Sequence, residues 1–524
     1  MSCIVRRNIN GRIYLYESTS YRDKLGNPQN KQVCIGKIDP DSGEPIYNGT
    51  YIQRMLQEGK IVQQQFSVQD IKRSAIKEMG AFYLFKCIAE ETGLLTILKR
   101  SLPACWAEVF NLACYLVASG EPLMYCEDWI SKTEVLPCTS MSPPRLSELL
   151  KEISVGQRTD FFEQWGAFRS EQEYLALDIT SISSYSELIT DVEWGYNRDK
   201  EKLPQINLCL LLGEQSGLPV FQSVYSGSLK DVSTLKTTLQ LSTGIVFPQM
   251  TLVMDKGFCS TKNINAMLND PAGIRFLIAM SFTLSFTQKQ VDSERKDIDC
   301  LDNAIVIGDD VLRGVTKERV WNIKHKLFTH VYYNAAAALT ARDKLYAHVV
   351  RLKERAYLNP ETAADDTEIK KYLIVRKSDI RATGYTINTR DDVVEQALRH
   401  NGWLVITSNH IADAKEAISI YRAKDVVEKG FWRMKNALDL YRIRVHSDNS
   451  VQNKVFVGFI ALLLMCRIHK VMLMHELYKS MSLHNLINSL AALRVQYING
   501  TRIIFPVTKT QHEIFKAFGF SDPV

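Results

Sequence analysis

The sequence predicts a mixed α/β protein, α+β overall, and three patterns carry this prediction. Short apolar runs separated by turn residues follow one another in the middle of the chain, as strands do. The region before them repeats apolar residues at helical spacing. An apolar stretch near the end has the composition of a buried helix. A chain of 524 residues with 46% hydrophobic and 23% charged residues is long enough for several domains.

The first two domains are predicted from turn chemistry and from periodicity. Residues 1–67 are expected to form a β-rich segment, because alternating runs at 12–16 and 31–36 flank a Gly-Asn-Pro turn. Residues 68–170 are expected to form a helical domain, since SAIKEMGAFYLFKCIAEETGLLTILKR has few glycines and an apolar side.

Residues 171–284 are predicted to form the first part of an α/β core. The runs YLALDITSI, QINLCLLL and LPVFQSVYSG are joined by a polar loop and a turn, which indicates an antiparallel meander. A helix from Asp231, a strand ending at Asp255, a helix over about 261–268 and the strand IRFLIAM follow. This order of elements is the one that a ribonuclease-H-like core requires.

The core pattern is then interrupted and resumes. Residues 285–400 combine polar strands such as KYLIVRKS with a charged helix and an acidic loop, which predicts a β-containing insertion. Residues 401–450 are expected to be the second part of the core, with the strand GWLVITSN and a long helix over about 412–438. Residues 451–524 are predicted to be a helical C-terminal region.

Composition argues against several classes of protein. The apolar run Val455–Cys466 is shorter than the roughly 20 residues that cross a bilayer, so a buried helix and no membrane partner are expected. The 11 cysteines form no C-x-x-C pair and no zinc-spaced cluster, which indicates a reducing cytoplasm. The start of the chain lacks the pattern of a secretory signal. A net charge of +6 suits a nucleic-acid partner without requiring one.

Two aspartates lie where strands are predicted. Asp178 sits inside an apolar strand, where a carboxylate is costly unless it meets a cation or a donor; the alternative is a hydrogen-bonded aspartate at the strand edge. Asp255 ends the run TLVM just before Gly257, and ligand groups favour such strand ends; the alternative is a turn aspartate.

The segment YRAKDVVEKGFWRMK carries a third acid in a regular polar stripe. Lys424, Glu428 and Lys435 follow Tyr421 by 3, 7 and 14 residues. At about 100° per residue these four positions fall within roughly 60° of one another on a helix. The alternative interpretation is a solvated charged face.

Together these residues indicate chemistry on phosphodiesters. Carboxylates from two strands and one helix can hold two divalent cations about 3.5–4 Å apart, which activates water and stabilises a leaving oxygen. Hard oxygen ligands select Mg²⁺ or Mn²⁺. Cationic and aromatic groups beside the third acid suit phosphates and an unpaired base.

On these residues the chain resembles the DDE transposases of bacterial insertion sequences, in the cut-and-paste group marked by Y-x2-R-x3-E-x6-K. Tyr421, Lys424, Glu428 and Lys435 match that motif, with Lys424 in place of Arg, which keeps the charge but loses bidentate phosphate recognition. The segments LALDITS, GLPVFQSVYSGSLKDVSTL, DKGFCSTKNI (relatives usually read D-R-G) and FVGFIALLLMC are similar to the same group.

The resemblance implies a ribonuclease-H-like core with a β-rich insertion between the second Asp and the Glu. Catalytic residues and ligands of two Mg²⁺ or Mn²⁺ ions would be the acids Asp178, Asp255 and Glu428. DNA-binding residues would be Tyr421, Lys424 and Lys435. Two other residues receive structural assignments: Asp231 caps the helix that follows it, and Trp321 packs in a core rather than stacking on a flipped base.

The implied reaction is cut-and-paste transposition. Nicking would free a 3′-OH, which would then attack target DNA. The partners would be double-stranded DNA, namely terminal inverted repeats and target, and a second copy of the chain in a homodimeric synaptic complex. The helical domain at 68–170 would bind the DNA ends. The place would be the bacterial cytoplasm, with nucleoid association when the protein is bound to DNA.

Two other classes of function stay open. One is a catalytically silent DNA-binding protein descended from a transposase, against which the intact acids and the tail argue. The other is a non-transposing nuclease with the same core, in which the Tyr and Lys face would make only generic DNA contacts.

Overall fold

The computed structural model divides into two compact units, Met1–Ala75 with Tyr497–Ile503, and Ile76–Gln496 with Ile504–Val524. The structure describes residues 2–9, 12–23, 26–38, 43, 45–57, 74–168, 174–231, 233, 235, 250–378, 384–498 and 501–524.

The first unit is built on a four-stranded antiparallel sheet of order β1-β2-β3-β4. Its elements are β1 (Ser2–Ile9), β2 (Arg12–Arg22), β3 (Pro28–Ile38), β4 (Pro45–Tyr47) and the helix α1 (Gly49–Gln57). Strands β2 and β3 pair across the Gly-Asn-Pro turn, where Gly26 has a φ of +85° that favours glycine. The alternating runs of the sequence therefore do lie in strands.

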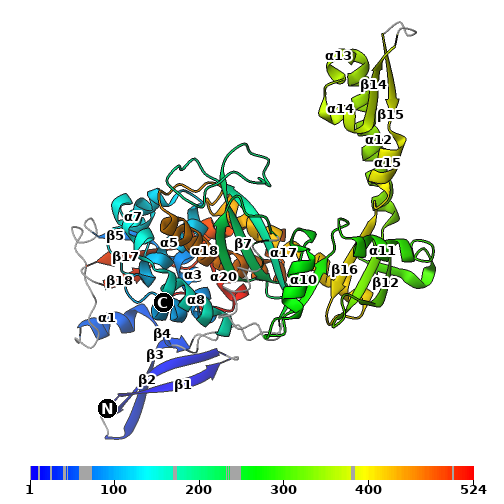
Figure 1. The fold of residues 1–524 in the computed structure, drawn as a ribbon. Helices are drawn as coiled ribbons and strands as arrows, with labels where there is room; N and C mark the ends of the chain where they lie inside the picture. The colour runs from blue at the N-terminus through cyan, green and yellow to red at the C-terminus, as the bar shows by residue number, and fades with distance from the viewer. Residues whose placement is uncertain are drawn as a thin grey trace. The chain divides into compact units, whose positions relative to one another are not determined.

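Helices from both ends of the chain pack together in the second unit (Figure 1). They are α3 (Gly80–Glu91), α4 (Leu94–Ser101), α5 (Trp106–Ser119), α6 (Cys126–Lys132), α7 (Pro143–Glu152), α8 (Val155–Phe168), α18 (Asp448–Met474), α19 (Leu483–Ala491) and α20 (Lys509–Ala517). The strands β5 (Ala75–Glu78), β17 (Arg494–Ile498) and β18 (Thr501–Ile504) form a separate three-stranded sheet of order β18-β17-β5. Helix α18 packs against α5, α7 and β8 (Pro219–Ser226).

Helix α18 is the apolar helix expected from the sequence. It is the one described helix long and apolar enough to cross a membrane, but 83% of its most apolar window is buried inside the protein. Its Phe456 meets Phe161 of α8 edge to face, with ring centroids 5.0 Å apart. Such packing is what a core helix requires.

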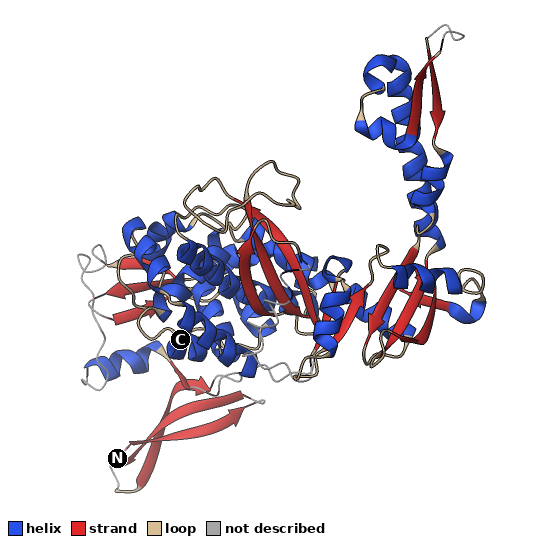
Figure 2. Ribbon diagram, in the orientation of Figure 1, coloured by secondary structure: helices blue, strands red, loops and turns tan. Residues whose placement is uncertain are grey.

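The centre of the second unit is a nine-stranded mixed sheet of order β11-β12-β13-β16-β10-β9-β6-β7-β8 (Figure 2). Its other strands are β6 (Tyr174–Ser183), β7 (Gln205–Gly213), β9 (Thr251–Met254), β10 (Arg275–Ala279), β11 (Ala304–Ile307), β12 (Asp310–Val320), β13 (Lys326–Tyr333) and β16 (Trp403–Ser408). Strands β6, β7 and β8 form an antiparallel meander, whereas β9 lies parallel to both β6 and β10. The predicted mixed α/β class is confirmed.

The residues between α10 (Thr261–Leu268) and β16 extend this sheet and add a small lobe. After α11 (Ser285–Glu294), strands β11, β12 and β13 join the sheet because β13 pairs with β16. The lobe contains α12 (Ala335–Leu358), α13 (Pro360–Ala363), α14 (Thr367–Tyr372), β14 (Leu373–Lys377), β15 (Tyr385–Thr389) and α15 (Asp391–Leu398). It has its own apolar cluster, which includes Val349, Leu352 and Ile369.

The long helix expected over about 412–438 is broken into three pieces. These are α16 (Ala414–Ala423), α17 (Asp425–Trp432) and a π-helical turn at Arg433–Ala437, and Asp413 caps the first piece. The predicted segment is helical over nearly its whole length, since Lys424 and Arg433 at the joins have right-handed helical backbone angles. Its last turn is π-helical, and this changes the angle per residue that a helical wheel takes as fixed.

Candidate active site

Asp178 and Asp255 lie side by side on two parallel strands. The register of β6 and β9 pairs Leu177 with Met254, so the next residue of each strand is one of the two aspartates. Neighbouring strands lie about 4.8 Å apart, so the two aspartates lie next to each other at the end of β9. The register therefore juxtaposes two of the predicted acids.

Glu428 reaches the same place from α17, which packs on β6 and β7. Gly430 permits this close packing of α17 on β7, because a Cβ at this position would lie 3.2 Å from side-chain carbons of Leu210 and Leu212. All three predicted acids, Asp178, Asp255 and Glu428, line one cavity of about 390 Å³.

The two aspartates differ in their hydrogen bonds and in their electrostatics. Asp255 accepts hydrogen bonds from the backbone N–H of Lys256 (2.7 Å) and from the hydroxyl of Tyr421 (2.8 Å), both at Oδ1. Asp178 accepts one from the N–H of Ile179 (2.8 Å). Burial raises the pKa of Asp178 to about 6, with Asp255 adding to the rise and Lys424 opposing it.

Tyr421 is partly buried beside the acids. Its ring packs against the apolar cluster around Ile418 and Ile420. Burial first, and then Asp255, Asp178 and Glu428, raise the pKa of its hydroxyl above the usual range. The hydroxyl therefore keeps its proton and can hold Asp255 in place.

The two lysines of the motif are buried and face carboxylates. Lys424 is 6% exposed, and its Nζ lies 3.8 Å from Glu428 Oε1. Lys435 is 8% exposed and pairs with Asp199 Oδ2 at 2.7 Å. Of the stripe, only Glu428 is largely open to solvent, with 65% of its side chain exposed. The lysines therefore do not belong to a solvated charged face.

Three further charged residues, Arg198, Asp199 and Asp231, line the cavity and were not predicted as part of the site. Arg198 pairs with Asp231, and a Cβ at Gly257 would lie 2.8 Å from Asp231 Oδ2, so a larger residue at 257 would require that carboxylate to shift. Most of the helix that Asp231 was expected to cap lies outside the described residues. The polar loop 193–202 has no periodicity from which these contacts could be read.

Trp321 directly follows β12 and is not one of the residues that line the cavity. Its indole N–H donates to Asn265 Oδ1 (2.8 Å), and its ring meets Phe286 edge to face at 5.1 Å. These contacts agree with the packing role expected for it.

The donor chemistry of the cavity fits a hard divalent cation. Five carboxylates line it, and Mg²⁺ and Mn²⁺ prefer such oxygens. Within the described part of the chain, however, no group of three or more His, Cys, Asp or Glu side chains is close enough together to hold a metal ion. A three-carboxylate site therefore requires these acids to come closer together than they lie in this structure.

The family model for the transposase DDE domain matches residues 169–464, more than half of the chain. The chain belongs to the DDE transposase family. Among solved structures, this transposase is similar to piggyBac transposase in a synaptic complex with hairpin DNA, at 10% identity and a TM-score of 0.37, over 79% of this chain and 70% of that one. The search of curated proteins gave no match.

The hydroxyl of Tyr421 gives a first prediction for this transposase. Tyr421→Phe keeps the ring but removes the donor to Asp255, so the apparent affinity for Mg²⁺ in DNA cleavage is expected to fall about tenfold, as for groups that orient a metal ligand. Cleavage rates over a Mg²⁺ titration measure this. Tyr174→Phe is the matched control, because its hydroxyl contacts Glu416 instead. Equal Mg²⁺ dependence in both variants would contradict the positioning role.

Proposed function

We propose that this transposase cleaves DNA at the ends of its element and joins them to target DNA, with Asp178, Asp255 and Glu428 as ligands of two Mg²⁺ or Mn²⁺ ions. One observation carries the proposal: acids from two adjacent parallel strands and one helix line a single cavity inside the matched family region. Acids so placed can share two metal ions.

The strand arrangement supports a ribonuclease-H-like core. In the order β8-β7-β6-β9-β10, the strands β8, β7 and β6 form an antiparallel meander. Strand β9 lies parallel to β6, and β10 lies parallel to β9. A core of this kind brings acids from the first and fourth strands of the chain order to neighbouring positions. The proposed core thus accounts for the pairing of Asp178 with Asp255.

The reaction proceeds in two steps. In the first, a water oxygen attacks a phosphorus at the element's end, the P–O3′ bond breaks, and the 3′ oxygen leaves as a hydroxyl. In the second, that hydroxyl attacks a target phosphodiester, and another 3′ oxygen leaves. Bound metal ions supply activation of the nucleophile and stabilisation of the leaving oxygen.

Other residues of the chain position the acids of the cavity. Tyr421 holds Asp255 through its hydroxyl, and the charge of Lys424 stabilises the ionised form of Asp178 and lies 3.8 Å from Glu428. Lys435 holds Asp199 at the rim of the cavity. The proposed partners are terminal inverted repeats and target DNA, bound by a homodimer in the bacterial cytoplasm.

The direct test uses purified protein, duplexes carrying the element's terminal inverted repeats, and Mg²⁺ or Mn²⁺. Strand cleavage that leaves a 3′-OH, followed by joining to target DNA, is the expected result. Binding without cleavage in either metal would favour the catalytically silent DNA-binding protein. Cleavage of any duplex, without joining, would favour a non-transposing nuclease.

Salt dependence tests the proposed DNA role of the two motif lysines. Lys424→Ala and Lys435→Ala are each expected to weaken binding to cleaved ends and to lower the slope of log affinity against log salt by about 0.9 on duplex DNA. Tyr421→Ala should change that slope less, since the tyrosine side chain carries no net charge. End binding at a series of KCl concentrations measures this. Unchanged slopes for both lysine variants would restrict these residues to holding Glu428 and Asp199.

A further inference from the structure

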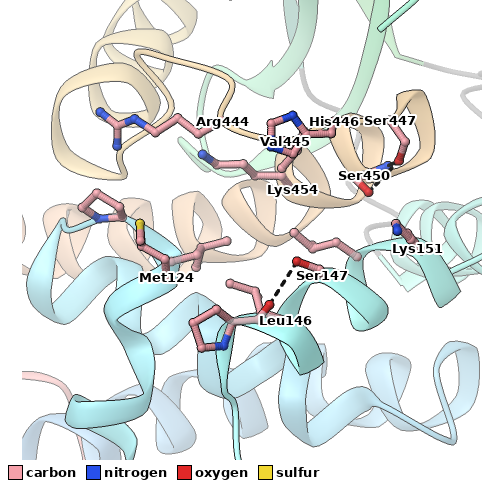
Figure 3. Close-up of a pocket in the computed structure, with 14 residues that line it drawn as sticks. Met124, Leu146, Ser147, Lys151, Arg444, Val445, His446, Ser447, Ser450 and Lys454 are labelled. Carbon is pink, nitrogen blue, oxygen red and sulfur yellow. Dashed lines mark hydrogen bonds between the residues drawn. The ribbon is translucent and has the colours of Figure 1, made fainter. Parts of the chain in front are cut away.

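A second cavity, of about 350 Å³, lies between α7 and the segment 444–447 that leads into α18. Figure 3 shows Arg444, His446 and Lys454 along one side of it and Leu146 on the opposite side. Leucines and prolines form much of its wall. Among the described residues that line it, none is Asp or Glu. The cavity therefore combines an apolar wall with a group of basic side chains.

Lys454 is the buried member of this group. Only 4% of its side chain is exposed. Its Nζ donates one long hydrogen bond to the carbonyl of Arg442 (3.4 Å) and lies 3.9 Å from Asp439 Oδ2. An ammonium has three N–H donors, so these contacts satisfy it incompletely. Burial lowers the pKa of Lys454 to about 8, which still leaves it mainly protonated at neutral pH.

The cations around the cavity outnumber the acid that faces them. Asp439 is shared, since it pairs with Arg444 at 2.9 Å as well as lying near Lys454. Lys151, from α7, makes no side-chain ion pair within the described residues, and neither does His446. An excess of positive charge around an apolar wall favours an anion that carries an apolar part.

The cavity shares a stretch of chain with the active site. Lys435 lines the active-site cavity, and the same segment continues through Arg442 to Arg444 at the second cavity. Arg442 also pairs with Glu201 at 2.6 Å, in the loop that carries Asp199. The short segment 435–444 therefore joins the lining of the two cavities.

We propose that this cavity binds a phosphate of the DNA backbone, with Lys151 and Lys454 at the phosphate and the adjoining deoxyribose against the apolar wall. The proposal rests on the proposed function and deepens it, because it assigns a grip on the DNA strand outside the cleavage site. Backbone contacts of this kind position a duplex and carry no sequence information.

The test compares Lys454→Met and Lys151→Gln with the control Lys479→Gln. Lys454→Met keeps the apolar stem, and Asp439 keeps its partner Arg444. Lys151 is exposed, so its variant is expected to fold even if the other does not. Lys479 pairs with Glu476 and lies outside the cavity lining. The probes are a short duplex without the element's end sequence, in a series of KCl concentrations, and inorganic phosphate alone.

Each cavity variant is expected to weaken duplex binding and to lower its salt slope by about 0.9, while the control matches the parent. Slopes equal to the parent's in both cavity variants would overturn the proposal. Protection from thermal unfolding by inorganic phosphate, lost in the cavity variants with unchanged duplex slopes, would also overturn it and assign a free anion instead. Cleavage by the parent is measured separately: lowered slopes with no cleavage would support this cavity and overturn the proposed catalysis.

Discussion

Glu428→Gln is expected to lower the rate of strand cleavage by at least about 10²–10³-fold, the loss that follows when one stabilising group is taken from a transition state. Gln keeps the size of the side chain and removes its charge. Because 65% of the Glu428 side chain is exposed, the change leaves the packing of α17 intact, and end binding should persist. Cleavage of labelled ends and a parallel binding assay measure the two effects.

Asp425→Asn is the matched control for this variant. Asp425 stands three residues earlier on α17, its carboxylate pairs with Lys429 at 2.6 Å, and it does not line the active-site cavity. The Asp425→Asn variant should cleave DNA at nearly the rate of the parent protein. If Glu428→Gln cleaved as fast as this control, another residue would have to be the third ligand. Asn at Asp178 or Asp255 should match the loss seen at Glu428, because all three charges are proposed to serve the same ions.

The strands of the core could be predicted because their signal is local. The runs YLALDITSI, QINLCLLL and LPVFQSVYSG hold β6, β7 and β8, and their continuous apolar character matches strands buried on both faces. The juxtaposition of Asp178 and Asp255 is less local, because Asp178 lies inside β6 and Asp255 directly follows β9; the parallel register of these two strands brings the acids together.

Contacts between segments that are far apart in the sequence could not be predicted from local patterns. Strand β13 pairs with β16 across a separation that contains the whole lobe, so the sheet extends into residues expected to be an insertion. Likewise, Lys435 meets Asp199, a residue of an aperiodic loop far back in the chain. Helical periodicity predicts that both motif lysines lie on the same helix face as Glu428. It does not predict that the two lysines are buried, because their burial depends on contacts with carboxylates that only the folded chain brings near.

The apparent affinity for Mg²⁺ is expected to fall about tenfold per pH unit below about pH 6, because a metal ligand must be deprotonated. Asp178 sets this dependence, since burial raises its pKa from the usual 3.8 to about 6. Protonation competes with the metal only below that value, so the affinity should be nearly constant above it. Thermal unfolding at several Mg²⁺ concentrations, from about pH 5 to about pH 8, measures the affinity without relying on cleavage.

The stability of the metal-free protein against unfolding provides an independent measure of the Asp178 pKa. A carboxyl whose pKa is higher in the folded state than in the unfolded state destabilises the fold when ionised; this cost is absent below about pH 3.8 and complete above about pH 6. Asp178→Asn removes it, so the variant should gain about 1–2 kcal/mol at neutral pH, after allowance for partial exposure, and almost nothing near pH 4. Asp270→Asn, in a surface turn after α10, is the control. A gain for Asp178→Asn that is equal at both pH values would assign it to packing, and a Mg²⁺ affinity independent of pH would remove Asp178 from the proposed ligands.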